Sequence, residues 1–210
     1  MNPIFDFFID PYRTYSTLDI LLEGAAVLTG LLSVWFAKQD KVWVYPSGMV
    51  STAIYVYLLL KAGLLGDLLI NAYYFAMSIY GWMFWSQQKE GVTVHQIDKV
   101  SASEKKWSFL LFALSLLFVG GLYASLGKWM SWTAPIDTFT TALFFVGMWL
   151  MARRKIVHWI YWIIGDLISI PLYLYKGLAL TSFQYLIFTL IAIFGYIQWK
   201  KVYNNRIQTV

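Results

Sequence analysis

The stretch from Leu178 to Trp199, LALTSFQYLIFTLIAIFGYIQW, contains no charged residue and is long enough to cross a lipid bilayer as a helix. A second stretch, from Leu64 to Trp85, reads LLGDLLINAYYFAMSIYGWMFW, and its one charged residue is Asp67. Both end in Gly, an aromatic residue, two further residues and Trp. The two glycines, Gly81 and Gly195, are displaced by 114 residues. These stretches predict equivalent membrane-spanning helices in an internally repeated chain.

The rest of the chain is also rich in apolar residues. Only 13% of its 210 residues are charged, about half the share found in soluble domains. Five further windows between charged residues are long enough to span a bilayer, namely 17–37, 42–60, 107–126, 135–152 and 156–175. The sequence therefore predicts an all-α integral membrane protein with seven transmembrane helices.

The polar stretch 86–106 divides these helices into two groups. We expect a single membrane domain over residues 1–210, with a first three-helix repeat at 17–85, a cytoplasmic loop at 86–106, a linker helix at 107–126 and a second three-helix repeat at 135–199. An offset of 115 places Trp43, Ser47 and Ser51 opposite His158, Trp162 and Asp166. The odd number of intervening helices gives a parallel repeat, so a substrate site is expected between the copies.

The Lys and Arg residues predict the orientation. Four of the sixteen lie in the N-terminal tail and in the loops on its side of the membrane, and twelve lie on the opposite side. Because short cytoplasmic loops retain positive charge, we expect the N-terminus outside and the C-terminus in the cytoplasm. This asymmetry accounts for the net charge of +5 without a nucleic-acid partner.

Polar residues inside three of the predicted helices share a face with aromatic residues. They are Asn71 and Tyr74 in 64–85, Trp159, Trp162, Asp166, Ser169 and Tyr173 in 156–175, and Gln184 and Phe188 in 178–199. Such residues at membrane depth are candidates for a substrate site. Asn71 and Gln184 also have a structural interpretation, as hydrogen-bonding groups between neighbouring helices.

Asp166 carries the strongest functional prediction. No Lys or Arg lies at its depth, so a cationic ligand, a proton or a water-filled cavity is needed to compensate the carboxylate. Trp and Tyr faces attract flat cations, and the expected ligand is therefore a small, planar, positively charged solute. Asp67 and Glu23 are candidates for an outer vestibule, although Glu23 could equally bond to a neighbouring helix.

Several other functions are disfavoured. The chain has no cysteine and two histidines, His95 and His158, so neither a metal site nor a serine protease site is expected. No Walker A pattern is present, so ATP is not expected to drive the protein directly. We predict no enzymatic activity and no cofactor.

The residues Gly66-Asp67-x-x-x-Asn71-x-Tyr73-Tyr74, Gly81-Trp82-x-x-Trp85, Trp159-x-x-Trp162-x-x-x-Asp166 and Pro171-Leu172-Tyr173 resemble the PnuC family of bacterial vitamin transporters, over about Leu18 to Trp199. The resemblance implies a three-one-three helix arrangement like that of SWEET sugar transporters, a homotrimer in the bacterial inner membrane, and facilitated diffusion of nicotinamide riboside that a cytoplasmic kinase traps by phosphorylation. It also implies a pocket wall made of Asn71, Tyr74, Trp162, Asp166 and Gln184.

Other functions stay open at the level of sequence. The family pattern ends in Asn or Asp, and Asp166 does not select one vitamin; thiamine is also a planar cation, and riboflavin is carried by relatives. We favour nicotinamide riboside as the commonest substrate of the family. The alternatives are a thiamine transporter, a proton-coupled carrier that uses Asp166 and Glu23, and a membrane receptor or scaffold whose polar face binds a partner helix.

Overall fold

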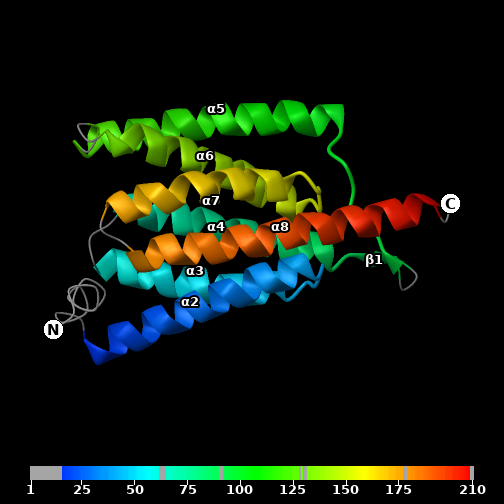
Figure 1. Ribbon diagram of the computed structural model, residues 1–210, viewed down its shortest axis with the longest axis horizontal. Coiled ribbons are helices and arrows are strands. Elements are labelled where there is room, and N and C mark those ends of the chain that lie inside the picture. The colour runs from blue at the N-terminus through cyan, green and yellow to red at the C-terminus, as the bar shows by residue number, and fades with distance from the viewer. Residues whose placement is uncertain are drawn as a thin grey trace.

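Seven helices make up almost all of the part of the chain that the computed structural model describes, which is residues 16–61, 65–89, 92–127, 129, 132–176 and 179–208. The helices are α2 (Thr17–Lys38), α3 (Val44–Lys61), α4 (Leu65–Trp85), α5 (Ala102–Ser125), α6 (Thr133–Ala152), α7 (His158–Tyr175) and α8 (Ala179–Gln208). They run side by side along the long axis of the molecule (Figure 1). The fold is therefore all-α, as the sequence predicts.

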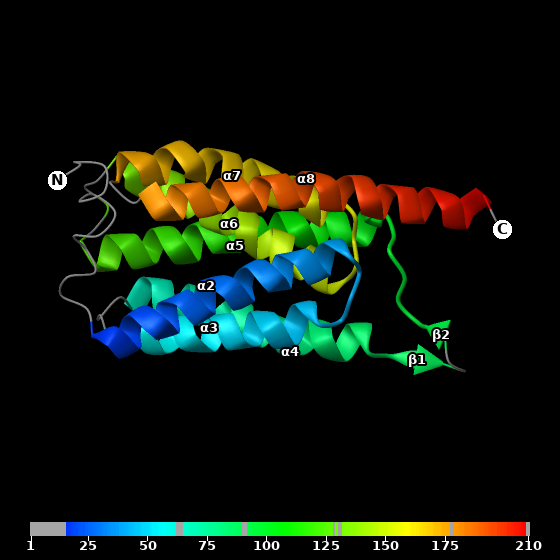
Figure 2. The same ribbon diagram turned by 60° about the horizontal axis from the view of Figure 1, so that its bottom comes forward.

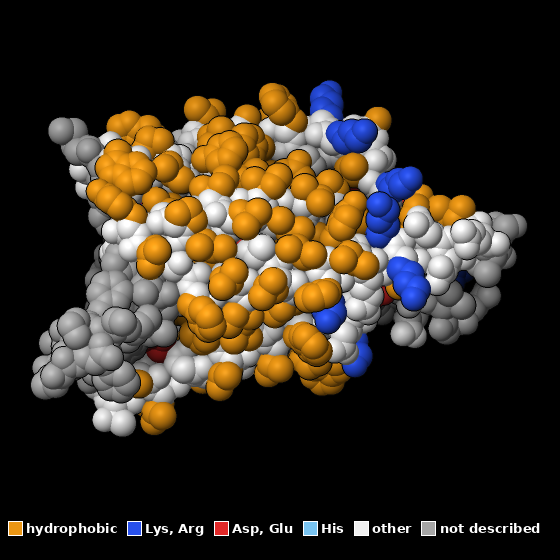
Figure 3. Space-filling view, viewed as in Figure 1, with side chains coloured by type: hydrophobic (Ala, Val, Ile, Leu, Met, Phe, Trp, Pro, Cys, Tyr) orange, Lys and Arg blue, Asp and Glu red, His pale blue; other side chains and the backbone are white. Residues whose placement is uncertain are grey.

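The outer surface of the bundle suits a lipid environment. Large apolar side chains are exposed along it, including Leu28, Phe109, Leu117, Leu167 and Phe194. By length and composition, four helices within the described residues are apolar enough to cross a membrane: Thr17–Lys38, Ala102–Ser125, Thr133–Ala152 and Thr181–Gln208. On the face shown in Figure 3, hydrophobic side chains cover the body of the bundle and Lys and Arg gather toward the end that carries the C-terminus.

The helices α2 to α4 repeat as α6 to α8. The end of the first helix, both ends of the second and the start of the third are each displaced by 114 residues. The helix α3 spans Val44–Lys61 and α7 spans His158–Tyr175, while α4 begins at Leu65 and α8 at Ala179. The contacts between the repeats are equivalent too, because α2 packs against α8 and α4 against α6. The offset of 115 expected for the second helix is one residue too long, so Gly48 and Thr52, instead of Ser47 and Ser51, correspond to Trp162 and Asp166.

The linker helix α5 packs against α6 at one edge of the bundle (Figure 1). It begins at Ala102, before the expected Trp107, because Ser101 and Glu104 form a capping box. The Glu104 amide donates to Ser101 Oγ at 3.2 Å, and the Ser101 amide donates to Glu104 Oε2 at 2.9 Å. These bonds satisfy backbone groups that the first turn of a helix leaves without partners.

The segment between α4 and α5 contains a short antiparallel hairpin of β1 (Gln88–Lys89) and β2 (Val92–Thr93), which lies beyond the end of α4 (Figure 2). Farther along, Asp98 pairs its backbone with the turn between α6 and α7. The helix α8 continues past the expected Trp199 to Gln208, and its Arg206 donates to Gln96 Oε1 at 2.7 Å. This contact holds the last turns of α8 beside the segment.

Candidate substrate site

A cavity of about 130 Å³ lies between the two repeats. Its walls come from α2, α3 and α4 on one side and from α6, α7 and α8 on the other. It extends from the middle of the helices toward the end of the bundle that carries the C-terminus, where Tyr45 lies in the first turn of α3 and Trp159 in the first turn of α7. This is the place that the internal repeat predicts for a substrate site.

One wall of the cavity is aromatic and is formed by Tyr45, Tyr74, Trp159, Trp162 and Phe188. Trp162 packs closely on Gly147, where an added Cβ would lie 2.5 Å from Trp162 Nε1. Within the described residues, no hydrogen-bond partner is found for the buried polar atoms Tyr45 OH, Trp159 Nε1 and Trp162 Nε1. A buried polar group without a partner costs about 1–3 kcal/mol, so a polar ligand beside this wall would be stabilised.

The part of the lining that comes from α2 and α3 also carries small hydroxyl groups that already donate hydrogen bonds. Ser33 Oγ donates to the Val44 carbonyl at 2.7 Å, Ser51 Oγ to the Ala26 carbonyl at 2.8 Å, and Thr52 Oγ1 to the Gly48 carbonyl at 2.9 Å. Since a hydroxyl has one hydrogen and two lone pairs, the free capacity of these groups is to accept. This hydroxyl wall of Ser33, Ser51 and Thr52 therefore suits a ligand that donates hydrogen bonds.

Two glycines make room for the hydroxyl wall. A Cβ added at Gly30 would lie 3.1 Å from Ser51 Oγ, and one added at Gly48 would lie 3.0 Å from Ser33 Oγ. This wall and Tyr45 were not predicted from the sequence, because Ser and Thr are common in helix interfaces and carry no charge that marks them. The signal that was available is the spacing of Gly30, Ser33, Gly48 and Ser51, which places small residues on facing helices.

Asp166 lies deeper in α7, next to this cavity and not on its surface. Only 1% of the residue is exposed, and its Oδ2 makes no hydrogen bond to any described residue. Asp166 interacts electrostatically with Tyr74, which does line the cavity, and with Tyr185. The buried Ser169 follows one turn later, and its hydroxyl is likewise without a partner among the described residues. A carboxylate in this place favours a positively charged neighbour.

The structure brings only part of the predicted site to the cavity. Tyr74, Trp159, Trp162 and Phe188 line it, whereas Asp166, Ser169 and Tyr173 follow one another farther along α7. The Tyr173 ring is 5.1 Å from that of Tyr185. Asn71 on α4, Gln184 on α8 and Glu23 on α2 are half-buried and do not line the cavity. The side chain of Asp67 lies outside the described residues.

Charged side chains lie away from the cavity. None of the described residues that line it is Lys, Arg, Asp or Glu, and the described part of the chain contains no cluster of His, Asp or Glu that could hold a metal ion. The nearest basic side chain in α7, His158, begins the helix and is buried against Trp159 and Trp199. The site therefore offers aromatic faces and neutral acceptors backed by one carboxylate.

Two parallel three-helix repeats joined by a linker helix, with a partly polar cavity between them, are the arrangement found in one class of membrane transporters. The model of the nicotinamide mononucleotide transporter family matches residues 20–201. The chain belongs to this family, which confirms the resemblance drawn from the sequence and the assignment as a transporter.

Individual relatives agree with this assignment. The chain is 25% identical over 210 residues to the nicotinamide riboside transporter PnuC of Escherichia coli K12, with 85% of this chain and 84% of that protein covered. It is 25% identical over 181 residues to the riboflavin/roseoflavin transporter RibM of Streptomyces davaonensis, with 82% and 81% covered. The crystal structure of a vitamin B3 transporter PnuC has the same fold, with a TM-score of 0.65, 22% identity and coverage of 96% of this chain and 90% of that one.

Proposed function

We propose that this chain carries nicotinamide riboside across the bacterial inner membrane by facilitated diffusion. The observation that carries the proposal is that aromatic faces and hydrogen-bond acceptors line the same cavity between the repeats. Nicotinamide riboside joins a flat pyridinium cation to a ribose. Aromatic faces attract such a cation, and the ribose hydroxyls donate to acceptors of the kind that the hydroxyl wall offers.

Asp166 supplies the counter-charge in this proposal. The carboxylate does not line the cavity but interacts with Tyr74, which does, so it stabilises a cation in the cavity without direct contact. Asn71, Ser169, Tyr173, Gln184 and Phe188 belong to the proposed pathway, and Glu23 and Asp67 to an outer vestibule. The PnuC proteins named above are described as nicotinamide riboside transporters, which supports this choice of vitamin over thiamine or riboflavin.

The cavity favours the riboside over the mononucleotide that appears in the family description. Phosphate groups are usually bound by Arg, Lys or helix N-termini, and the described lining has no Arg or Lys. A dianion beside Asp166 would add repulsion to an uncompensated dehydration cost. Exclusion of the phosphorylated form also permits trapping, because the product of a cytoplasmic kinase cannot leave by the same path.

The remaining parts of the proposal concern topology and assembly. The gathering of Lys and Arg at the end that carries the C-terminus supports a cytoplasmic C-terminus and an external N-terminus (Figure 3). The family resemblance supports a homotrimer. Each subunit has its own cavity between its own repeats, so transport is expected within one chain.

Uptake by vesicles that contain the purified protein tests the proposal. We expect labelled nicotinamide riboside to enter, nicotinamide mononucleotide to stay outside, and excess thiamine to compete poorly. Asp166→Ala should lower riboside uptake at least tenfold, while Asp19→Asn, at the outer start of α2, should have a smaller effect. Equal entry of the two nicotinamide compounds, or full activity of a well-folded Asp166→Ala variant, would contradict the proposal.

A further inference from the structure

The two repeats are tied together at the cytoplasmic end by a pair of equivalent hydrogen bonds. Trp85, at the end of α4, donates from Nε1 to the Ala152 carbonyl at 3.1 Å, and Trp199 in α8 donates to the Ala37 carbonyl at 2.9 Å. Both tryptophans are buried and are displaced by the repeat length of 114. Each repeat thus uses its third helix to hold the end of the first helix of the other repeat.

An ion pair joins the same two helix ends. Asp40 follows α2 and Arg154 follows α6 at equivalent positions, and both have left-handed backbones, with φ of 55° and 54°. Arg154 Nε lies 3.2 Å from Asp40 Oδ1, and the guanidinium lies 4.3 Å from the centre of the Trp85 ring. The repeat has therefore placed opposite charges at equivalent positions, where they meet across the interface.

A layer of aromatic residues separates these contacts from the cavity. Tyr45 and Trp159 occupy equivalent positions, line the cavity and are buried. Tyr45 packs edge-on against Trp85 at 5.2 Å, and Trp159 packs edge-on against Trp199 at 5.8 Å. A ligand that leaves the cavity toward the cytoplasm would have to pass between these rings.

The described ion pairs at the outer end are different in kind. Lys61 pairs with Asp19 at 2.6 Å, and Lys176 pairs with Asp137 at 2.6 Å. The first pair lies within α2 and α3, and the second joins the residue after α7 to α6, so each connects helices of one repeat. These pairs would survive a separation of the two repeats, whereas the contacts of Trp85, Trp199 and Asp40 would not.

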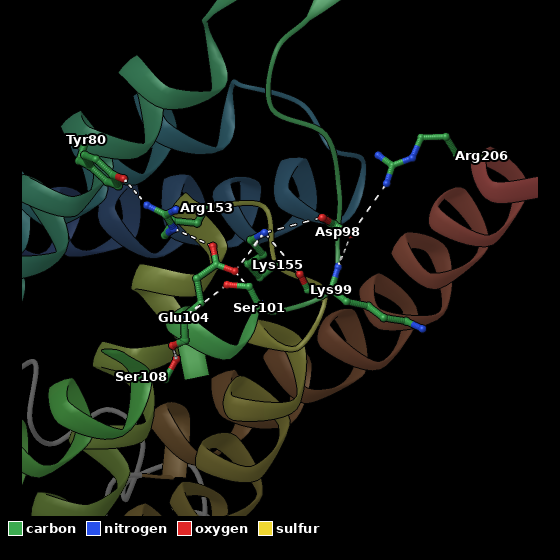
Figure 4. Close-up of polar contacts among 9 residues, drawn as sticks. All are labelled: Tyr80, Asp98, Lys99, Ser101, Glu104, Ser108, Arg153, Lys155 and Arg206. Atoms are coloured by element: carbon green, nitrogen blue, oxygen red, sulfur yellow. Dashed lines mark hydrogen bonds and ion pairs between the residues drawn. The ribbon is translucent and has the colours of Figure 1, made fainter. Parts of the chain in front are cut away.

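At the cytoplasmic end, the ion pairs of the linker helix α5 join it to the turn after α6 in the second repeat. Glu104 at the start of α5 pairs with Arg153 Nε at 3.0 Å and with Lys155 Nζ at 3.2 Å, the two residues that flank Arg154 (Figure 4). Arg153 also donates to the Tyr80 hydroxyl at 3.3 Å. Because Glu104 grips the turn after α6 and not the turn after α2, α5 and the second repeat would move as one body against the first repeat.

We propose that Asp40, Tyr45, Trp85, Arg154, Trp159 and Trp199 form the cytoplasmic gate of this transporter, and we name this set the inner clasp. The proposal rests on the proposed transport function and adds the residues that close one end of the path. In the structure the inner clasp is shut. Release of the substrate requires the two tryptophan hydrogen bonds, the ion pair and the hydrogen bond from Arg153 to Tyr80 in α4 to break together.

Thiol labelling can test the inner clasp directly, because the chain has no cysteine of its own. Ser51→Cys places a reporter on the hydroxyl wall, and a membrane-impermeant maleimide is applied to the cytoplasmic face of inside-out vesicles. Trp85→Phe and Trp199→Phe keep an aromatic ring but remove the hydrogen bond, and we expect each to raise the labelling rate at least threefold. Trp107→Phe on the exposed face of α5 is the matched control and should leave the rate unchanged.

An exchange of the charges of Asp40 and Arg154 provides a second test, which does not depend on the folding of the tryptophan variants. Asp40→Arg alone should raise the labelling rate, and the double variant Asp40→Arg with Arg154→Asp should bring it back toward that of the parent. Unchanged labelling in all folded clasp variants, or no rescue by the exchange, would overturn the gate. The readout needs no substrate, so a responsive clasp in a protein that rejects nicotinamide riboside would refute the proposed vitamin and retain the gate.

Discussion

Asp40 and Arg154 face one another at the end of the bundle that carries the C-terminus, and both are partly removed from water. Burial raises the pKa of the Asp40 carboxyl to about 6, and the nearby Arg154 only partly opposes this change. Burial likewise lowers the pKa of Arg154, with Asp40 opposing. The desolvation of the two charges therefore exceeds their attraction, as is common for buried pairs. Such a pair fixes which residues meet in the closed state but adds little to the stability of that state.

This balance predicts that acid favours the closed clasp. When the clasp opens, Asp40 enters water and its pKa returns toward the usual 3.8. Between about pH 4 and 6 the closed state then binds more protons than the open state, so closure becomes more favourable as the pH falls. We expect cytoplasmic labelling of Ser51→Cys, corrected for maleimide reactivity with a free thiol, to slow severalfold between pH 7 and 5.

The control for this prediction must separate Asp40 from its titratable neighbours. Arg154 stays charged over this range. It donates to the backbone carbonyl of His95, whose imidazole also lies in the segment before α5. Asp40→Asn should remove the pH dependence, whereas His95→Gln should retain it. A dependence that disappears only in His95→Gln would assign the effect to the histidine.

Substitutions of Trp162 can show whether its ring binds the substrate through a cation–π contact. A cation–π contact contributes about 0.5–2 kcal/mol, and Phe retains part of it. Trp162→Ala should therefore weaken nicotinamide riboside binding more than Trp162→Phe, by calorimetry on the detergent-purified protein. Equal losses from the two substitutions would show that Trp162 contributes by packing on Gly147 instead.

Among the elements, the third helix of each repeat depends on a glycine at the contact with the second helix. A Cβ at Gly81 would lie 2.3 Å from the Tyr45 ring, and a Cβ at Gly195 would lie 2.6 Å from the Trp159 ring. The Gly-aromatic-x-x-Trp ending that predicted the repeat therefore has a packing role. The glycine leaves space for the ring of Tyr45 or Trp159. The tryptophan one turn later donates a hydrogen bond to the other repeat.

This packing predicts a loss of stability when a methyl group is added. Gly81→Ala should lower the free energy of unfolding by about 1–3 kcal/mol, because overpacking forces neighbouring rings from their positions. Gly121→Ala on α5 is the matched control, since nothing lies within 4 Å of the added atom. It should be neutral or stabilising by up to about 1 kcal/mol. Thermal unfolding in detergent distinguishes them, and equal midpoints would contradict the packing role of Gly81.

At the scale of the whole molecule, the two repeats form a path for the substrate, and the sequence shows no ATP-binding motif that could drive transport along it. The sequence contains no Walker A pattern, so liposomes with this protein alone should equilibrate nicotinamide riboside without concentrating it. An internal kinase with ATP should then produce accumulation of the phosphorylated compound. Accumulation driven by a proton gradient alone would instead support the carrier that uses Asp166 and Glu23.

Much of this architecture could be predicted from the sequence because its signals are local. Runs of about 20 apolar residues define spanning helices wherever they occur in a chain, and the displacement between Gly81 and Gly195 is readable without knowledge of contacts. The aromatic face of α7 follows from helical spacing alone. For these reasons the helices and the parallel repeat were predicted from the sequence, and the predicted residues Trp159 and Trp162 lie in the lining of the cavity.

The walls of the cavity and the inner clasp were decided by the tertiary structure. Ser33 and Ser51 are ordinary helix residues until α2 and α3 come together around Gly30 and Gly48. Asp40 and Arg154 lie in separate turns, and nothing in either turn indicates that the two charges meet. Hydrophobicity and helical period act along the chain, whereas ion pairs and shared cavities depend on which surfaces of distant helices pack together. That choice is made only when the two repeats associate.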